Sequence, residues 1–421
     1  GFIKNRITET LGDLYGMHWP FKQHKTSRNI KTLPHHENLK SFGACFGVSG
    51  GYERPMWFSL DGEKSEYEYS YNYQNWYPSA EYETNNTIKN VGLFDLSPFS
   101  KFEIKSEKAH QELQKICTAN IKNEIGKCTY THMLNKDGGI ETDLTVICLD
   151  KDYFRIISSA ATRERDKFHI RKYLSREIEL KDVTDNFCVF GVFGPKSRDL
   201  LESLSTEDFK NENFKFGTAK NIIIDGIKIW AQRLSYVGEL GFELYVESQD
   251  AKKIYELIIN KGKDYNLSNC GMHAMDIMRM ESGFLHWGHD ISPEENQYQA
   301  GLSFTISNKK DINFVGKKAL DKISQTKIKS RFAMFTLKNS KPGEPLLLHD
   351  EPIYLDDKII GRTTSGNYSF NFKKNLAFGY ITTDLTNDEL VKKNIFIEVE
   401  KIKHKAEILL KPLKQSNFKI N

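Results

Sequence analysis

Short strands joined by tight turns alternate with amphipathic helices along most of this chain, and this mixture constrains the fold more than any other feature. From Val91 onward, segments such as 100–105 alternate apolar and polar residues as strands do, and 107–121 has the spacing of an amphipathic helix. Asp225 and Gly226 separate two apolar runs, which predicts a hairpin with a two-residue turn. Because a purely parallel, doubly wound sheet contains no hairpins, the sequence predicts the α+β class.

Three segments of different character divide the 421 residues, a length that exceeds one typical domain. Residues 1–90 are rich in Tyr, Trp and Gly and weakly periodic, so we expect an extended connector that packs over another surface. Residues 91–325 carry the alternating strands and helices and should form the body. Residues 326–421 contain short strands with Gly and Asp turns, which predicts a small all-β domain.

Composition excludes several classes of function. A net charge of +4 does not suit a surface that neutralises a phosphate backbone, so no nucleic-acid partner is expected. Every apolar run is broken by charge well before the roughly 20 residues that a membrane span needs, so no membrane association is expected either. The six cysteines contain no C-x-x-C pair, which predicts reduced thiols and a cytoplasmic location rather than disulfides or a structural zinc.

Common cofactor and catalytic motifs are missing from the sequence. It has no phosphate-binding G-x-x-x-x-G-K-[ST] and no G-x-G-x-x-G between a strand and a helix. The sequence has no H-E-x-x-H, and its one G-x-S-x-G match, Gly47 to Gly51, lies in an irregular stretch and forms no nucleophile elbow, which counts against hydrolases. The chain alone should therefore not bind a dinucleotide through a Rossmann unit.

Histidines gather at two places. His286, His289 and Asp290 lie within five residues, as metal ligands can, but the intervening glycine favours a turn in which the histidines are hydrogen-bonded. We therefore predict no metal site. His35 and His36 are expected to be solvated.

Two carboxylates are ambiguous from spacing alone. Asp143 follows the turn 135–139 at the start of an apolar strand, where a turn-stabilising or exposed role is favoured over a site beside a cavity. Glu243 and Tyr245 alternate with apolar residues along 241–247, so they share the face opposite the core. A solvated outer face is the favoured interpretation.

Several motifs, taken in order, resemble the aminomethyltransferase (T-protein) family of the glycine cleavage system. They are Leu93 to Ser97, Asn135 to Gly139 with Asp143-Leu144, Gly194-Pro195, Tyr236 to Glu243, Asp276 to Gly283, Thr364 to Gly366, and Gly379-Tyr380. The resemblance implies a ring of three domains around a central channel for tetrahydrofolate, with a small β-barrel domain at the C-terminus.

The sequence looks closer still to the C-terminal, folate-binding half of dimethylglycine and sarcosine dehydrogenases. Asp95 to Phe99 and His286 to Asp290 carry this likeness, and Tyr52 to Pro55 resembles the connector between the two halves of those enzymes. Those relatives carry an FAD domain that this sequence does not contain. The resemblance therefore implies an FAD-bearing domain or subunit as a partner, and no FAD bound by this chain alone.

By the same resemblance, Asp143 matches the family's essential carboxylate beside the pterin, where it can orient the attacking amine and accept its proton. Glu243 matches the residue that reads the pterin edge, whose two neighbouring N–H groups suit one carboxylate. The positions that match the wall of the folate site are Phe99, Tyr130, Ile157, Ser159, Tyr236 and Phe304.

Three positions depart from the T-protein pattern. Thr142 stands where that enzyme has a second acid, Met275 where it has an arginine, and Gln299 where it has a glutamate. These differences count against transfer from a lipoyl-bound aminomethyl group. They favour capture of a methylene from an oxidised N-methyl amine.

The leading hypothesis is a tetrahydrofolate-dependent transferase that moves a one-carbon unit from a small N-methylated or aminomethyl donor. A second hypothesis is one half of a flavin-dependent dimethylglycine or sarcosine dehydrogenase. A third is a non-catalytic folate-binding protein.

Overall fold

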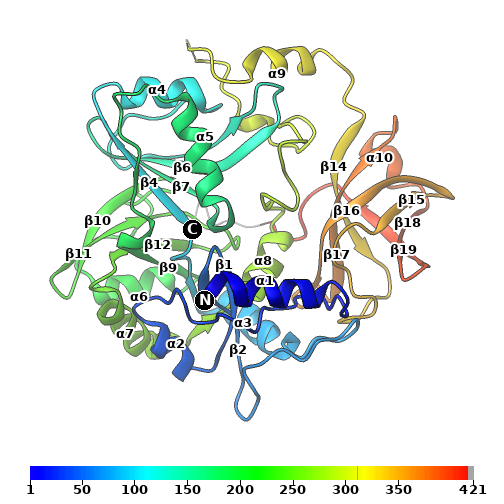
Figure 1. Cartoon of the computed structure of the whole chain (residues 1–421), viewed down its shortest axis with the longest axis horizontal. Coiled ribbons are helices and arrows are strands. Elements are labelled where there is room, and N and C mark those ends of the chain that lie inside the picture. Colours follow the sequence, from blue (N-terminus) through cyan, green and yellow to red (C-terminus); the bar gives the residue numbers. More distant parts are fainter. Residues whose placement is uncertain (311, 416–421) are drawn as a thin grey trace.

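Three bodies lie around a common centre in the computed structural model, which describes residues 1–310 and 312–415 (Figure 1). Two are sheets covered by helices, and the third is a closed barrel. This arrangement confirms the α+β class and the three-domain ring with a C-terminal barrel.

The first body is a six-stranded sheet in the order β10-β11-β12-β9-β3-β13. Its strands are β10 (Ala219–Ile224), β11 (Ile227–Gln232), β12 (Gly241–Glu247), β9 (Phe187–Phe193), β3 (Val91–Asp95) and β13 (Leu267–Cys270). Asp225 and Gly226 form the predicted β10–β11 turn, with φ of 49° and 77° that suit a hairpin of this kind. The helices of this body are α3 (Tyr77–Lys89), α6 (Ser197–Leu204), α7 (Ala251–Gly262) and α8 (Met272–Glu281).

The second body is a five-stranded sheet in the order β5-β6-β7-β4-β8. Its strands are β5 (Cys128–Leu134), β6 (Ile140–Asp150), β7 (Tyr153–Ser158), β4 (Ser100–Lys105) and β8 (Lys181–Asp182). The helices α4 (Ala109–Ile116) and α5 (Arg163–Tyr173) belong to it, and Leu113 and Ile170 pack on one face of the sheet with Leu144 and Val146. The other face is left for the site.

The third body is the closed barrel β14-β17-β16-β15-β18-β19. Its elements are β14 (Ser330–Leu337), β15 (Pro352–Leu355), β16 (Lys358–Ser369), β17 (Lys374–Thr382), α10 (Asn387–Leu390), β18 (Ile395–Val399) and β19 (Ile402–Leu409). The helix α9 (Lys317–Ser324) precedes it. A buried network joins the barrel to α8, because Arg279 Nη2 donates to Ser365 Oγ at 2.9 Å and Arg279 Nη1 bonds Asp290 at 2.5 Å.

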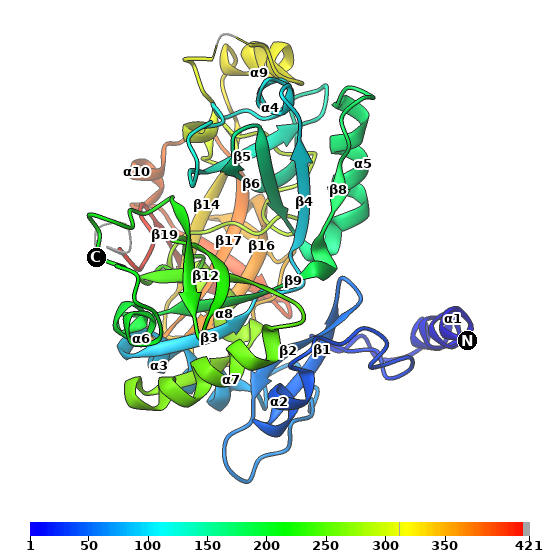
Figure 2. The ribbon, with the colours of Figure 1, turned by 90° about the vertical axis from the view of Figure 1, so that its left-hand side faces the viewer.

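Residues 1–90 contain more regular structure than their sequence predicts. The helices are α1 (Phe2–Asp13) and α2 (His36–Ser41), and β1 (Ala44–Ser49) pairs with β2 (Tyr52–Phe58) around a turn at Gly50 and Gly51, which have φ of 57° and 84°. The helix α1 stands away from the rest of the chain (Figure 2). No helix in the described ranges is long and apolar enough to cross a membrane.

Candidate functional site

Tyr130, His132 and Asp143 lie on the free face of the five-stranded sheet. His132 on β5 is the direct register partner of Asp143 on β6. Since Leu144 and Val146 on β6 enter the hydrophobic core, strand alternation turns Asp143 to the opposite face. The turn 135–139 therefore carries Asp143 into a polar, half-buried site rather than onto the surface that its spacing alone favours.

Asp143 is a half-buried carboxylate with an oxygen atom that is unpaired within the described ranges. Its side chain is 19 % exposed, and among the described residues its Oδ1 atom has no hydrogen-bond partner. Burial raises the pKa of Asp143 to about 7, although the nearby Tyr130 hydroxyl partly offsets this effect. A carboxyl group that titrates near neutrality can accept a proton at physiological pH.

His132 is completely buried and its ring lies next to the Asp143 carboxylate. Its Nε2 atom lies 3.7 Å from Asp143 Oδ1 and 3.3 Å from the Tyr130 hydroxyl. Its Nδ1 atom lies 3.0 Å from Thr305 Oγ1 and 3.2 Å from Gln297 Nε2. Burial lowers the pKa of His132 to about 3, so the ring is neutral at pH 7.

Glu243 lies on β12 of the six-stranded sheet. Phe242, Leu244 and Val246 enter the core, as expected, and Glu243 and Tyr245 take the other face. The spacing alone favours a solvated face, and this expectation is wrong. Tyr245 is buried on that face and packs in a second hydrophobic cluster. Burial raises the pKa of Glu243 to about 7, and the Tyr245 hydroxyl, which donates to Oε2 at 3.1 Å, lowers it in part.

Apolar side chains connect the two sheets. Phe99, Ile157 and Tyr236 pack against the same hydrophobic cluster, which also contains Tyr245. The Tyr236 hydroxyl donates to the Leu285 carbonyl at 2.9 Å, which fixes its ring at the edge of the site.

Besides Tyr130, described above, the expected wall residues Phe304 and Ser159 remain, and they differ from these three. The Phe304 ring is 73 % exposed and lies 6.5 Å from the Tyr130 ring, nearly parallel to it. Ser159 turns toward its own helix, where its hydroxyl accepts a hydrogen bond from the Ala161 amide at 3.3 Å. The arrangement gives Phe304 room to cover a flat ligand, whereas Ser159 faces its own backbone.

The two groups of histidines lie among side chains that organise the fold. The expectation that His35 and His36 are solvated is wrong, since both are buried and His35 Nε2 lies 3.2 Å from Asp95 Oδ2. Asp290 accepts from Arg279 and from the His286 amide, so its carboxylate organises a loop. Among the described residues, no three His, Cys, Asp or Glu side chains are grouped to hold a metal.

Reasoning from the sequence missed the polar support beneath Asp143, namely His132, Gln297 and Thr305. The hairpin indicates only that His132 lies near Asp143, because counting outward from the turn 135–139 brings 132 opposite 142, and a bulge shifts the pairing by one residue. Gln297 and Thr305 come from a distant loop, and no local pattern indicates them.

The fold and the site define a family. Residues 35–310 match the family described as "GCVT N-terminal domain", and residues 331–414 match the "Glycine cleavage T-protein C-terminal barrel domain". The chain therefore belongs to the glycine cleavage T-protein (aminomethyltransferase) family, as its motifs indicate.

Particular relatives extend this result. The chain is 36 % identical over 384 residues to 4-methylaminobutanoate oxidase (formaldehyde-forming) of Paenarthrobacter nicotinovorans, covering 91 % of this chain and 46 % of that relative. It is 32 % identical over 307 residues to an aminomethyltransferase of Halothermothrix orenii, covering 72 % of this chain and 83 % of the relative. The chain thus spans about half the length of the oxidase.

The fold has a solved counterpart. The glycine cleavage system aminomethyltransferase T of Bartonella henselae superposes with a TM-score of 0.79 at 22 % identity, covering 92 % of this chain and 99 % of that one. This likeness establishes the fold.

Proposed function

We propose that this chain binds tetrahydrofolate and transfers a one-carbon unit to it from a small N-methylated or aminomethyl donor. The observation that carries the proposal is Asp143, a half-buried carboxylate whose pKa is about 7 and whose Oδ1 atom has no partner in the described part of the chain. Membership of the aminomethyltransferase family supports the same reaction class.

The residues present fit a reduced folate. Glu243 offers a carboxylate to the neighbouring N–H groups of a pterin edge, which are paired donors. Phe99, Ile157 and Tyr236 supply an apolar wall, and the exposed Phe304 ring can pack on a flat heterocycle.

Each group has a separate task in this proposal. Tetrahydrofolate supplies the nucleophilic nitrogen that takes up the carbon. Asp143 orients that amine and accepts its proton at Oδ1 or Oδ2, and its pKa of about 7 suits a base at neutral pH. The His132 ring lies next to the carboxyl group, and the Tyr130 hydroxyl lies beside both.

Anaerobic titration of tetrahydrofolate into the wild-type chain and Asp143→Ala tests the proposal. We expect saturable binding to the wild type. Transfer should be lost in Asp143→Ala and kept in Asp61→Ala, which changes an exposed aspartate. A wild-type chain that shows no saturable binding at high micromolar folate would overturn the proposal.

A second candidate function is the folate-binding part of a flavin-dependent amine dehydrogenase or oxidase. The observation that favours it is the match to the oxidase relative at 36 % identity over 91 % of this chain, against 32 % identity over 72 % of this chain for the aminomethyltransferase. In that case the donor would be an iminium made by oxidation of an N-methyl amine on an FAD-bearing partner. Transfer that appears only when such a partner is added would favour this second function.

A further inference from the structure

Gln232 lies directly opposite Glu243. The two residues are register partners on the antiparallel strands β11 and β12, so their side chains leave the same face of the sheet as neighbours. Ile229 and Ala231 on β11 enter the hydrophobic core, which turns Trp230 and Gln232 to the face that carries Glu243. Trp230 packs against the hydrophobic cluster that also holds the aromatic wall.

The Gln232 carboxamide is buried without any partner. The residue is 0 % exposed, and neither its Oε1 nor its Nε2 atom makes a hydrogen bond with any residue that the structure describes. The indole N–H of Trp230 is unpaired in the same sense. Buried polar groups are almost always hydrogen-bonded, because leaving them unpaired is unfavourable. Three unpaired polar atoms on the sheet face that carries Glu243 point to a polar ligand as their partner.

We propose that Gln232 is a second reader of the ligand edge that Glu243 recognises, and that it selects a 2-amino-4-oxopyrimidine ring. This inference rests on the proposed function. An ionised carboxylate only accepts hydrogen bonds, whereas a carboxamide both donates and accepts. Glu243 can therefore take the ring N–H and amino donors, and Gln232 Nε2 can donate to the ring carbonyl.

Access to Gln232 requires small side-chain movements. Gln232 itself is covered, but its neighbours Trp230 and Glu243 are both partly exposed and border the site. Turning the Trp230 side chain aside, with Glu243 kept in place for the ring donors, would uncover the carboxamide on the face that carries Glu243.

Two substitutions and two probes test the proposal. The probes are 5-formyltetrahydrofolate, whose ring is 2-amino-4-oxo, and aminopterin, whose ring carries a 4-amino donor in place of the carbonyl. Gln232→Met should weaken binding of the 4-oxo probe about tenfold or more. It should not lower the melting temperature of the ligand-free protein, because it removes an unpaired amide from a buried position.

Gln232→Glu makes the opposite chemical change, since a carboxylate cannot donate to the carbonyl but can accept from a 4-amino group. It should therefore reduce the ratio of 4-oxo to 4-amino affinity at least tenfold. This ratio is independent of how much of the variant is folded, so it holds even where the substitution destabilises the chain. Gln325→Glu, an exposed position, serves as the matched control and should leave the ratio unchanged.

The outcomes separate the two proposals. Wild-type chain that binds neither probe would overturn the proposed function and this inference with it. A second outcome would overturn only the role of Gln232. In that outcome the wild type binds both probes, Gln232→Met binds the 4-oxo probe as tightly as the wild type, and Gln232→Glu keeps the wild-type ratio of 4-oxo to 4-amino affinity.

Discussion

His132 Nε2 lies 3.7 Å from Asp143 Oδ1, across the paired strands β5 and β6. The other ring nitrogen of His132 contacts Thr305 and Gln297, which fixes the ring orientation. Because burial lowers the pKa of His132 to about 3 and raises that of Asp143 to about 7, only the carboxyl group titrates near neutrality. Asp143 thus lies beside a neutral imidazole whose other nitrogen contacts Thr305 and Gln297.

Replacing His132 should disturb catalysis more than binding. The asparagine of His132→Asn is shorter than histidine and no longer lies against the Asp143 carboxylate. We therefore expect the transfer rate to fall about tenfold or more, while tetrahydrofolate affinity changes less than about threefold. The midpoint of the pH–rate profile should also move, because the surroundings of Asp143 change. Rates and affinities measured between pH 5.5 and 9 check this. The exposed His349→Asn is the control, and a His132→Asn profile identical to that of the control would contradict the prediction.

Asp143 should make the ligand-free protein less stable as pH rises. Its pKa is raised from 3.8 to about 7 in the folded chain, so the folded state binds the proton more tightly, and stability is lost as pH increases from about 4 to about 7. Asp143→Asn removes this effect and should be more stable than wild type at pH 8 by on the order of 2–4 kcal/mol. This gain in the free energy of unfolding of Asp143→Asn over wild type should become smaller toward pH 4.

Urea unfolding of both proteins at pH 4.5 and pH 8 measures this difference. Glu243, whose pKa is also about 7, contributes equally to both proteins and cancels in the comparison. A gain of the same size at both pH values would show that the substitution acts through packing rather than through ionisation.

The sequence predicted which strand faces Glu243 and Tyr245 occupy, but not the surroundings of the two carboxylates. Strand alternation correctly placed Glu243 and Tyr245 opposite the core, but whether that face meets water depends on the second cluster, which comes from distant segments. A bulge between Met133 and Leu134 shifts the β5–β6 pairing by one residue, so the exact partner of Asp143 follows only from the three-dimensional pairing.

The first ninety residues show why weak periodicity misleads. β2 is buried along nearly its whole length, so it lacks the apolar–polar alternation that marks a half-exposed strand. The helix α2 has only six residues, too few for a repeating pattern. His35 looks like a surface residue in sequence because its partner Asp95 is 60 positions away.

The His35–Asp95 pair should hold this region to β3. Both side chains are buried, and although burial alone would lower the pKa of His35, the Asp95 carboxylate raises it to about 9. Removing one partner of a buried pair typically costs about 3–5 kcal/mol, and we expect His35→Gln to lose stability in this range at pH 7. The contribution of His35 is complete below about pH 6.5 and declines as pH rises through about 9.

Urea unfolding at pH 7 and pH 9.5 tests this pH dependence. The difference between wild type and His35→Gln should be smaller at pH 9.5, while the exposed His18→Gln should match wild type at both. An equal loss at the two pH values would mean that the imidazole acts by packing against Phe190 and Tyr255 rather than by its charge.

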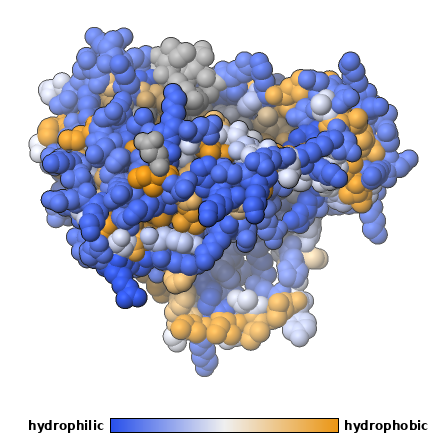
Figure 3. Space-filling model, turned by 90° about the horizontal axis from the view of Figure 1, so that it is seen from above, coloured by the Kyte–Doolittle hydropathy of each residue, from blue (hydrophilic) through white to orange (hydrophobic). Residues whose placement is uncertain are grey.

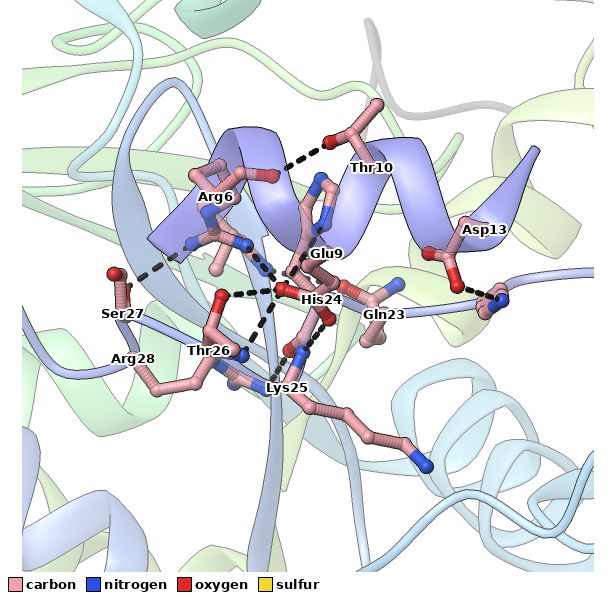
Figure 4. Close-up of polar contacts among 12 residues, drawn as sticks. Arg6, Glu9, Thr10, Asp13, Gln23, His24, Lys25, Thr26, Ser27 and Arg28 are labelled. Carbon is pink, nitrogen blue, oxygen red and sulfur yellow. Dashed lines mark hydrogen bonds and ion pairs between the residues drawn. The ribbon is translucent and has the colours of Figure 1, made fainter. Parts of the chain in front are cut away.

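Polar contacts with residues 22–27 attach the helix α1 to the chain. None of its residues is buried, and apolar side chains such as Ile7 and Leu11 are more than half exposed, which contributes to the apolar surface on the protruding part in Figure 3. Glu9 makes the main attachment: its carboxylate accepts from the Lys25 amide at 2.5 Å and from the Thr26 amide at 3.1 Å (Figure 4). Although burial alone would raise it, these bonds lower the pKa of Glu9 to about 2, so the attachment persists at neutral pH.

Glu9→Ala should therefore release α1 without unfolding the body. We expect limited proteolysis between residues 14 and 25 to become at least about tenfold faster, because local opening governs cleavage there. The free energy of unfolding should change by less than about 0.5 kcal/mol, as for a surface substitution, and tetrahydrofolate affinity should not change. Lys4→Ala, which alters an exposed residue of the same helix, is the control and should keep the wild-type cleavage rate. A cleavage rate for Glu9→Ala equal to that of Lys4→Ala would mean that Asp13–Lys22 and Arg6–Ser27 suffice to hold the helix.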